Sequence, residues 1–311
     1  MNIKWFVIVN PVAGNGETAQ KWHEIEEELN IHKFDFKAVF SEYKSHESEL
    51  AQSAVEEGYT HIICVGGDGT LHNVVNGLMN SPKSIENIKL GIIPLGTGND
   101  WIKNYGIEKD IKIAIQILKQ NKTVYQDIGY LKLDNAKREV YFNNLAGIGF
   151  DGYVVYKVNN YKKLGVLAYL AGALVSLAGY KRSHLKIEMN GKTIQTKSLL
   201  FLIGLCEYCG GGMKLTKNVN SSDGLFDITS VEKITLIQLV NNLPGLFNGK
   251  ITRKKFVKTF KTDALKVTVL KGDKAYIQAD GELIGVGGFE IKMHKKALQF
   301  IVPKIKKLNK S

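Results

Sequence analysis

The chain has 311 residues and is 44% hydrophobic, which is enough for one large core or two ordinary ones. Its three cysteines, Cys64, Cys206 and Cys209, are too few for a disulfide framework, and no second cysteine pair or nearby histidine completes a zinc site. The formal net charge of +12 favours polyanionic partners. No groove of interleaved aromatic and basic residues indicates nucleic acid, so an anionic membrane face or a phosphorylated substrate remains.

The first third of the chain alternates β-branched runs with helical patterns. The opening run MNIKWFVIVNP lacks the layout of a secretory signal, and we expect a cytoplasmic protein. Helices are expected near residues 17–30, 46–57 and 70–80, with strands before and between them. This rhythm predicts a parallel α/β sheet, in which ligands gather at the carboxyl ends of the strands.

From about residue 125 the pattern changes to short strand-like runs that are punctuated by Gly, Asn and Asp. Such a pattern predicts a mostly antiparallel sandwich or barrel. We therefore expect two domains, residues 1–130 and 131–296, with the boundary near residue 130. No internal repeat is seen, and the chain closes with a basic tail.

One segment, residues 164–179, contains no charged residue and is flanked by Lys162, Lys163, Lys181 and Arg182. A helix of this length would span roughly 24 Å, which is short of the roughly 30 Å hydrocarbon core of a bilayer. Its leucines and alanines also recur at helical spacing. We expect a helix that packs on the sandwich or lies at a membrane surface.

The stretch VGGDGTLHNVVNGLM ends a buried strand and begins a helix, so Gly66, Gly67 and Gly69 lie at the turn. Glycines allow a ligand to approach the backbone closely, and the amides at a helix N-terminus favour phosphate oxygens. Asp68 would repel a polyphosphate unless Mg²⁺ bridged the two. The alternative is that Asp68 only caps a helix or forms a turn.

Two further glycine-containing turns follow predicted strands, NPVAGNG at residues 10–16 and PLGTGND at residues 94–100. All three would lie at the same sheet edge. The phosphate signature GxxxxGK[ST] is absent, and the GIGFDG run at 147–152 lacks the acidic residue that would hold a ribose. Gly147 and Gly149 therefore predict a packing turn near the site.

These motifs, together with GGGM, DGLFDI and DGE in the same order, resemble the soluble bacterial diacylglycerol kinase-like lipid kinases, relatives of sphingosine and ceramide kinases. The resemblance implies an α/β nucleotide-binding domain and a β-sandwich, with ATP between them and a lipid hydroxyl as acceptor. It also implies that the chain end, about residues 297–311, returns to the first domain.

The family's nucleotide contacts fall on the following positions of this chain: Asn10, Ser41, Gly66, Gly67, Asp68, Gly69, Thr70 and Thr97. Ser41 stands where threonine is usual and keeps the hydroxyl. Asn73 stands where relatives commonly carry glutamate. This change removes a carboxylate from the helix and leaves the phosphate-binding turn intact.

The resemblance also implies a structural Mg²⁺ in NVNSSDGLFDI, held by the Asp223 side chain, the Leu225 carbonyl and Asn220. Asn and backbone oxygens are ordinary ligands for a hard cation, but they lower the ligand charge. A plain Asp-Gly turn before the next strand is the alternative.

The run QADGELIG supplies two more carboxylates, Asp280 and Glu282. A lipid hydroxyl that attacks a γ-phosphate needs a carboxylate to accept its proton. Residues two apart on an extended strand share a face, so either could act; Asp280 is our first choice. A hairpin turn without chemistry is the alternative.

We therefore expect an ATP- and Mg²⁺-dependent lipid kinase of phospholipid metabolism, with diacylglycerol as the leading acceptor. It would bind an anionic membrane surface peripherally through its basic residues. An NAD kinase-like enzyme and a non-catalytic lipid-binding regulator of the same fold are the alternatives, and a homodimer is left open.

Overall fold

The computed structural model describes residues 3–134, 139–158, 172, 175–177, 179–217, 219–270 and 274–303. The chain divides into two compact units, one formed by residues 1–126 with 296–311 and the other by residues 127–295. The sequence places the boundary near residue 130. Two strands, β5 (Thr123–Leu133) and β18 (Phe289–Ile301), contain residues of both units.

The first unit is built on a parallel sheet in the order β2-β1-β3-β4, completed by the end of β18. The bounds are β1 Lys4–Val9, β2 Asp35–Phe40, β3 His61–Gly66 and β4 Lys89–Pro94. Residues of β3 are buried throughout, and β1 and β4 nearly so. Continuous Val and Ile runs are typical of parallel strands that are covered on both faces.

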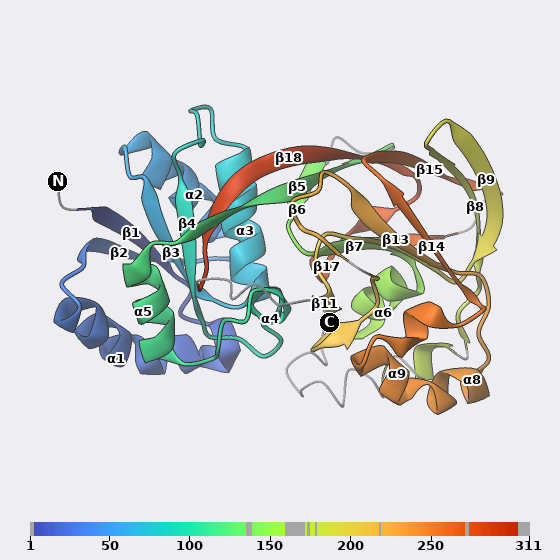
Figure 1. Ribbon diagram of the computed structural model, residues 1–311, viewed down its shortest axis with the longest axis horizontal. Helices are drawn as coiled ribbons and strands as arrows, with labels where there is room; N and C mark the ends of the chain where they lie inside the picture. Colours follow the sequence, from blue (N-terminus) through green and yellow to red (C-terminus); the bar gives the residue numbers. More distant parts are fainter. Residues whose placement is uncertain are drawn as a thin grey trace, which may run out of the picture. The chain divides into compact units, whose positions relative to one another are not determined.

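Helices connect these strands: α1 (Glu17–Ile31), α2 (His46–Glu56), α3 (Asp68–Met79), α4 (Asp100–Asn104) and α5 (Ile111–Gln120), with a 3₁₀ turn η1 at Ala13–Gly16. Helices α2 and α3 pack against each other, as do α1 and α5 (Figure 1). A Cβ at Gly77 of α3 would collide with the Ser48 carbonyl of α2. The α2–α3 pair is therefore in close backbone contact.

The second unit is a sandwich of antiparallel strands. One sheet has the order β14-β13-β10-β7-β16-β17, and in the other β18, β15, β8 and β9 are consecutive, with β5 beside β18 and β6 beside β5. Their bounds are β6 Glu139–Phe142, β7 Leu145–Gly149, β8 Ser183–Met189, β9 Lys192–Ser198, β10 Leu200–Gly204, β13 Phe226–Val231, β14 Val257–Thr262, β15 Ala264–Leu270, β16 Tyr276–Ala279 and β17 Glu282–Val286. The remaining elements are α6 Phe150–Val158, the ribbon β11 Tyr208–Cys209 with β12 Met213–Lys214, α8 Leu236–Asn241, α9 Leu243–Phe247 and η3 Lys250–Arg253.

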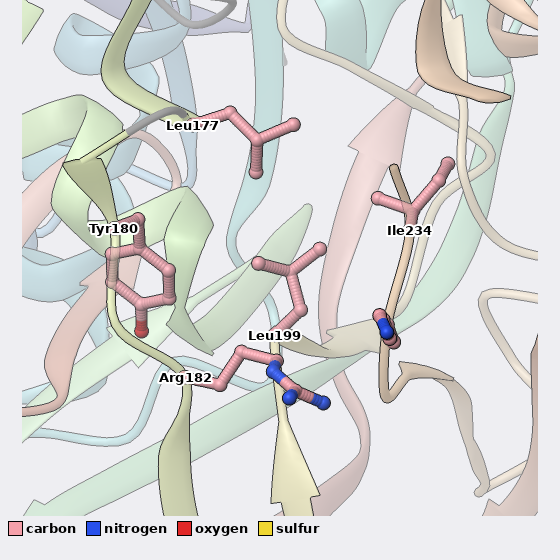
Figure 2. Close-up of a pocket in the computed structure, with 6 residues that line it drawn as sticks. Leu177, Tyr180, Arg182, Leu199 and Ile234 are labelled. Carbon is pink, nitrogen blue, oxygen red and sulfur yellow. The ribbon is translucent and has the colours of Figure 1, made fainter. Parts of the chain in front are cut away.

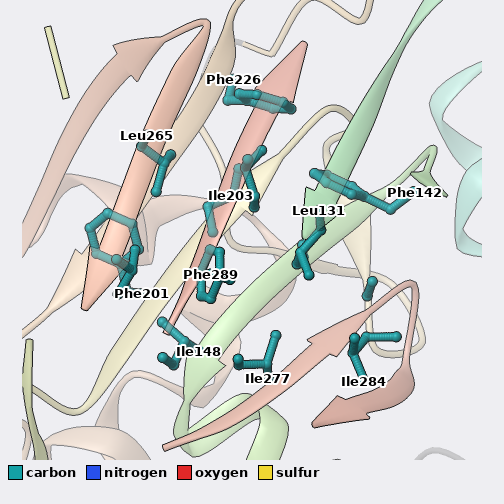
Figure 3. Packing of buried hydrophobic residues seen from close by; sticks show 14 of the residues in the cluster. Leu131, Phe142, Ile148, Phe201, Ile203, Phe226, Leu265, Ile277, Ile284 and Phe289 are labelled. Carbon is teal, nitrogen blue, oxygen red and sulfur yellow. The ribbon is translucent and has the colours of Figure 1, made fainter. Parts of the chain in front are cut away.

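The core of this unit lies between the two sheets. Alternate residues of β8 are buried, as expected for a strand with one face on the core. Both sheets contribute to one cluster, labelled in Figure 3, that includes Leu265 and Phe289 from one and Ile148, Phe201 and Ile277 from the other. The predicted fold, an α/β domain and a β-sandwich with the chain end returning to the first sheet, is confirmed.

The expected helix at 164–179 and the residues Lys162 and Lys163 lie largely or wholly outside the described residues, as does the basic tail. Within the part of the chain that the structure describes, no helix combines the length and apolar character needed to cross a bilayer.

Candidate functional site

The three glycine-containing turns of the first unit meet at the carboxyl end of its sheet. The Asn10 amide after β1 donates to the Val65 carbonyl of β3, and the Leu95 amide after β4 donates to the Gly66 carbonyl. The side-chain amide of Asn10 donates to the Thr70 hydroxyl at 3.0 Å. A Cβ on Gly67 would lie 3.1 Å from the Cα of Gly96, so these two turns are in backbone contact.

The N-terminus of α3 projects from this edge. Gly67 is its N-cap in an extended conformation and provides no side-chain cap. A Cβ at Gly69 would meet nothing within 4 Å, which leaves this turn open to a ligand. Backbone amides without a side-chain cap, at the positive end of a helix dipole, suit phosphate oxygens.

Asp68 reaches from α3 to the neighbouring turn. Its Oδ2 accepts a hydrogen bond from the Asp100 amide at 3.0 Å, and its Oδ1 accepts one from the Trp101 amide at 3.1 Å. Asp68 therefore caps α4 from a distance of more than thirty residues in sequence. A carboxylate has about four acceptor positions, so these bonds leave capacity for other partners. A role beside the phosphates stays a prediction.

A buried carboxylate that the sequence analysis missed lies behind Ser41. Glu47, in the first turn of α2, is only 3% exposed. Its Oε1 accepts from the Ser41 hydroxyl at 3.0 Å, and its Oε2 accepts from the Asn73 side-chain amide at 2.9 Å. The carboxylate that position 73 lacks is thus supplied by the adjacent helix. In sequence, Glu47 resembles any acidic residue at a helix N-terminus.

Thr97 lies on the exposed part of the third turn. Lys109 braces this turn, because its ammonium donates to the Gly96 carbonyl at 2.7 Å and to the Thr97 carbonyl at 3.3 Å. Asn99 adopts a left-handed conformation with φ of 48° and donates to the Gly96 carbonyl. The turn therefore has a fixed shape, although Thr97 itself is accessible.

In the second unit, the expected magnesium loop is tied to Asp127 of β5. The Asp127 amide donates to the Ser221 carbonyl, and its carboxylate accepts from the Gly224 amide at 2.7 Å. The predicted ligand Asn220 uses its side-chain oxygen to accept from both the amide and the hydroxyl of Ser222.

The other side-chain ligand, Asp223, accepts from the Leu225 amide at 3.1 Å and from the Lys261 ammonium at 2.9 Å. Lys261 also lies 3.3 Å from Asp227. Burial alone would lower the pKa of Lys261. Hydrogen bonding to Asp223 and attraction to Asp227 outweigh it and raise the pKa of Lys261. The described residues contain no group of three His, Cys, Asp or Glu that could hold a metal ion. The predicted site is of another kind, one carboxylate with an amide and a backbone oxygen, and in this structure the Lys261 ammonium occupies part of the Asp223 carboxylate. The magnesium site therefore stays a prediction.

The turn between β16 and β17 carries the two candidate bases. Asp280 has a φ of 49°, so it lies in a tight turn and not on an extended strand. Asp280 and Glu282 therefore do not share a strand face, and the prediction that they do is wrong. Asp280 accepts three backbone hydrogen bonds of 2.9–3.1 Å, which come from the amides of Asn143, Asn144 and Leu145.

Glu282 is half-buried. Within the described parts of the chain its side chain makes no hydrogen bond or ion pair, whereas Asp280 anchors the turn to the start of β7. The hairpin expected as the alternative is present. Its Asp280 carboxylate is held by backbone hydrogen bonds, and its Glu282 carboxylate is not.

Comparison with known families agrees with this architecture. Residues 4–131 match the diacylglycerol kinase catalytic domain, and residues 144–302 match the YegS C-terminal NAD kinase beta sandwich-like domain. A diacylglycerol kinase of Staphylococcus aureus (strain bovine RF122 / ET3-1) is 31% identical over 90% of this chain and 86% of its own. One from Staphylococcus haemolyticus (strain JCSC1435) is 29% identical over 96% of this chain and 88% of its own.

Solved structures show the same fold. A diacylglycerol kinase from Bacillus anthracis str. Sterne superposes with a TM-score of 0.72 at 21% identity, covering 96% of this chain and 97% of its own. Yeast NADH kinase superposes more distantly, with a TM-score of 0.57 at 11% identity over all of this chain and 89% of its own.

An α/β unit with converging glycine turns, followed by an antiparallel sandwich, defines a class of phosphotransferases that use an alcohol acceptor. The chain belongs to the diacylglycerol kinase-like family of lipid kinases.

Proposed function

We propose that this lipid kinase transfers the γ-phosphate of ATP to the hydroxyl of diacylglycerol. The observation that carries the proposal is the meeting of three glycine-containing turns beside the uncapped N-terminus of α3. The backbone amides there would bind the phosphates, and Asn10 would hold Thr70 in place. The Mg²⁺ that accompanies ATP would neutralise charge on the phosphates, with Asp68 as the nearest candidate carboxylate.

The proton of the lipid hydroxyl needs an acceptor. As the oxygen attacks the γ-phosphorus, its O–H bond breaks, and the bond to ADP breaks on the other side. Three of the roughly four acceptor positions of Asp280 are already used by backbone amides. We therefore favour Glu282 as the base and assign Asp280 to holding the turn, which reverses the order of preference drawn from sequence.

Peripheral binding to an anionic membrane is supported by a surface of the second unit. A cavity of about 180 Å³ is lined by the side chains labelled in Figure 2 together with Lys233. Leu177, Leu199 and Ile234 give it apolar surface, and Arg182 and Lys233 add two positive charges. Beside Ile234 in sequence, α8 exposes Ile237 to 74%. Apolar and basic groups in combination suit the surface of an anionic bilayer.

The experiment that tests the function is a product assay. Purified protein, Mg²⁺ and ATP would be incubated with a total lipid extract and, separately, with NAD, and products identified by mass spectrometry. Phosphatidic acid as the dominant new product supports diacylglycerol as the acceptor. A different phosphorylated lipid would identify another acceptor. Phosphorylated NAD would favour the NAD kinase alternative. If no acceptor gave a product, the non-catalytic regulator would be favoured.

A further inference from the structure

A second carboxyl group lies behind the Asp280–Glu282 turn. Asp151 is in the first turn of α6, directly after β7. Its Oδ2 accepts a hydrogen bond from the Gln278 side-chain amide at 3.0 Å, while its Oδ1 is buried with no hydrogen-bond partner in the described structure. Burial raises the pKa of Asp151 to about 7. Burying a polar oxygen without a hydrogen bond costs free energy, so this carboxyl group is expected to have a structural or functional role.

Gln278 connects this carboxyl group to the turn. It lies on β16 and is only 4% exposed. Its Nε2 faces Asp151, and its Oε1 accepts a hydrogen bond of 2.9 Å from the amide of Gly281, the residue between Asp280 and Glu282. An amide side chain has one donor end and one acceptor end. By occupying the donor end, Asp151 fixes the acceptor end toward Gly281.

The glycines of GIGFDG make room for this chain of contacts. Gly147 of β7 is paired in register with Gln278 of β16. A Cβ at Gly147 would collide with Oδ2 of Asp151, and one at Gly152 would collide with the Tyr276 carbonyl. The small glycines of GIGFDG, a motif that matches no dinucleotide site, thus leave the space that lets the Asp151 side chain reach Gln278. Gly147 is expected in a packing turn; it lies within strand β7 instead, and its role is close packing.

We propose that Asp151 is a positioning residue for the Asp280–Glu282 turn, acting through the amide of Gln278. The proposal rests on the proposed function, because it assigns the turn to catalysis. The turn then has two anchors: Asp280 holds it to the residues before β7, and Gln278 holds the Gly281 amide. If Asp151 lost its acceptor oxygen, Gln278 could reverse and present its NH₂ to the Gly281 amide. Two donors would then face each other, and Glu282 would lose its fixed position.

Four variants test this. Asp151→Leu and Gln278→Leu each break the chain of contacts, and we expect each to lower kcat at least tenfold with the KM for ATP unchanged. The double variant should be no worse than either single one, because both remove the same link. Asp151→Asn keeps an acceptor oxygen and should restore kcat to within about threefold of wild type. Ile187→Val, a buried change on β8 outside the chain of contacts, is the control for lost stability.

Hydrogen exchange at the Gly281 amide gives a readout that does not depend on the reaction. We expect it to quicken at least tenfold in Asp151→Leu and Gln278→Leu and to stay unchanged in Ile187→Val. If Asp151→Leu does not fold, Gln278→Leu and Asp151→Asn carry the test. Wild-type kcat and Gly281 exchange in the two leucine variants would overturn the proposal, as would effects that add in the double variant. If the wild-type protein phosphorylates no lipid, the proposed function is refuted instead. The hydrogen-exchange measurement would still test whether Asp151 and Gln278 hold the Gly281 amide.

Discussion

Asn73 of α3 donates a 2.9 Å hydrogen bond to Glu47 of α2, and the same carboxylate accepts a hydrogen bond from the Ser41 hydroxyl. Ser41 has only one proton to donate, so its oxygen faces any ligand as an acceptor. A carboxylate on the neighbouring helix therefore sets the hydrogen-bonding character of a predicted nucleotide contact.

Glu47→Gln would introduce a side-chain amide that can donate to Ser41 and would reverse this character. We expect the affinity for ATP, measured by calorimetry, to fall about tenfold, which corresponds to about 1.4 kcal/mol. Asn73→Glu would place a second carboxylate against Glu47 and lower the melting temperature. Combining both changes moves the carboxylate to position 73 and should recover most of both losses. ATP affinity within twofold of wild type in Glu47→Gln would contradict this role.

Asp68→Asn keeps the size of the side chain but puts an amide donor toward the amides of Asp100 and Trp101. We expect turnover to fall at least a hundredfold, because the charge that we propose to lie beside the phosphates is lost. Helix α4 also loses part of its cap, so the melting temperature should fall by a few degrees.

The matched control for this change is Asp110→Asn. Asp110 caps α5 through the Ile113 amide, a role in a different helix from the glycine turns. It should lower stability slightly and leave turnover unchanged. If Asp68→Asn behaved in the same way, Asp68 would be a cap and nothing more.

Asp280→Asn and Glu282→Gln should distinguish the catalytic base from the residue that holds the turn. Glu282→Gln should lower kcat at least a hundredfold with normal melting temperature and nucleotide affinity, because it removes only a proton acceptor. Asp280→Asn should lower kcat and melting temperature together, since its carboxylate holds three backbone amides. A fully stable but inactive Asp280→Asn beside an active Glu282→Gln would return the base to Asp280.

The pKa of Asp151, raised by burial to about 7, predicts how stability depends on pH. Between about pH 4 and pH 7 the folded chain keeps a proton that the unfolded chain releases. Asp151 therefore makes stability fall as pH rises through this range, by up to about 1.4 kcal/mol per pH unit. Asp151→Asn should lose this contribution. Its free energy of unfolding, compared with that of wild type, should therefore be more favourable at pH 8 than at pH 5. Urea unfolding at both pH values measures it, and identical pH profiles would refute it.

Membrane docking predicts cosedimentation with anionic vesicles, weak binding to neutral ones and a steep loss of binding with salt. Arg182→Glu with Lys233→Glu should weaken binding without changing ATP affinity, and Lys162→Glu with Lys163→Glu should do the same. Lys4→Glu with Lys33→Glu changes the net charge equally in the first unit and is the control. Equal binding to neutral and anionic vesicles, or equal effects of all the charge pairs, would reject a local docking surface.

The sequence predicts those features that depend on local pattern. Valine and isoleucine runs at β1, β3 and β4 indicate strands covered on both faces, and strands of one parallel sheet bring their carboxyl ends together. The meeting of the turns at Asn10 and Gly66 follows from this geometry.

Contacts between distant residues have no such pattern. Glu47 and Asn73 are 26 residues apart on different helices, and Asp68 caps a helix 32 residues away. For Asp280 the sequence left two interpretations open, because the residue fits a strand end as well as a turn, and only the structure shows the left-handed turn conformation.

The last strand has a consequence for biosynthesis. Gln299 and Phe300 of β18 pair with Lys89 and Leu90 on the outer side of β4. The ribosome makes β4 early and β18 only after the whole second unit, so through most of translation β4 is an unpaired, apolar sheet edge. Such edges invite pairing with other chains. The nascent first unit is therefore a natural client for chaperones, and deleting residues after 295 should send the protein into aggregates during synthesis even though every predicted site residue is still present.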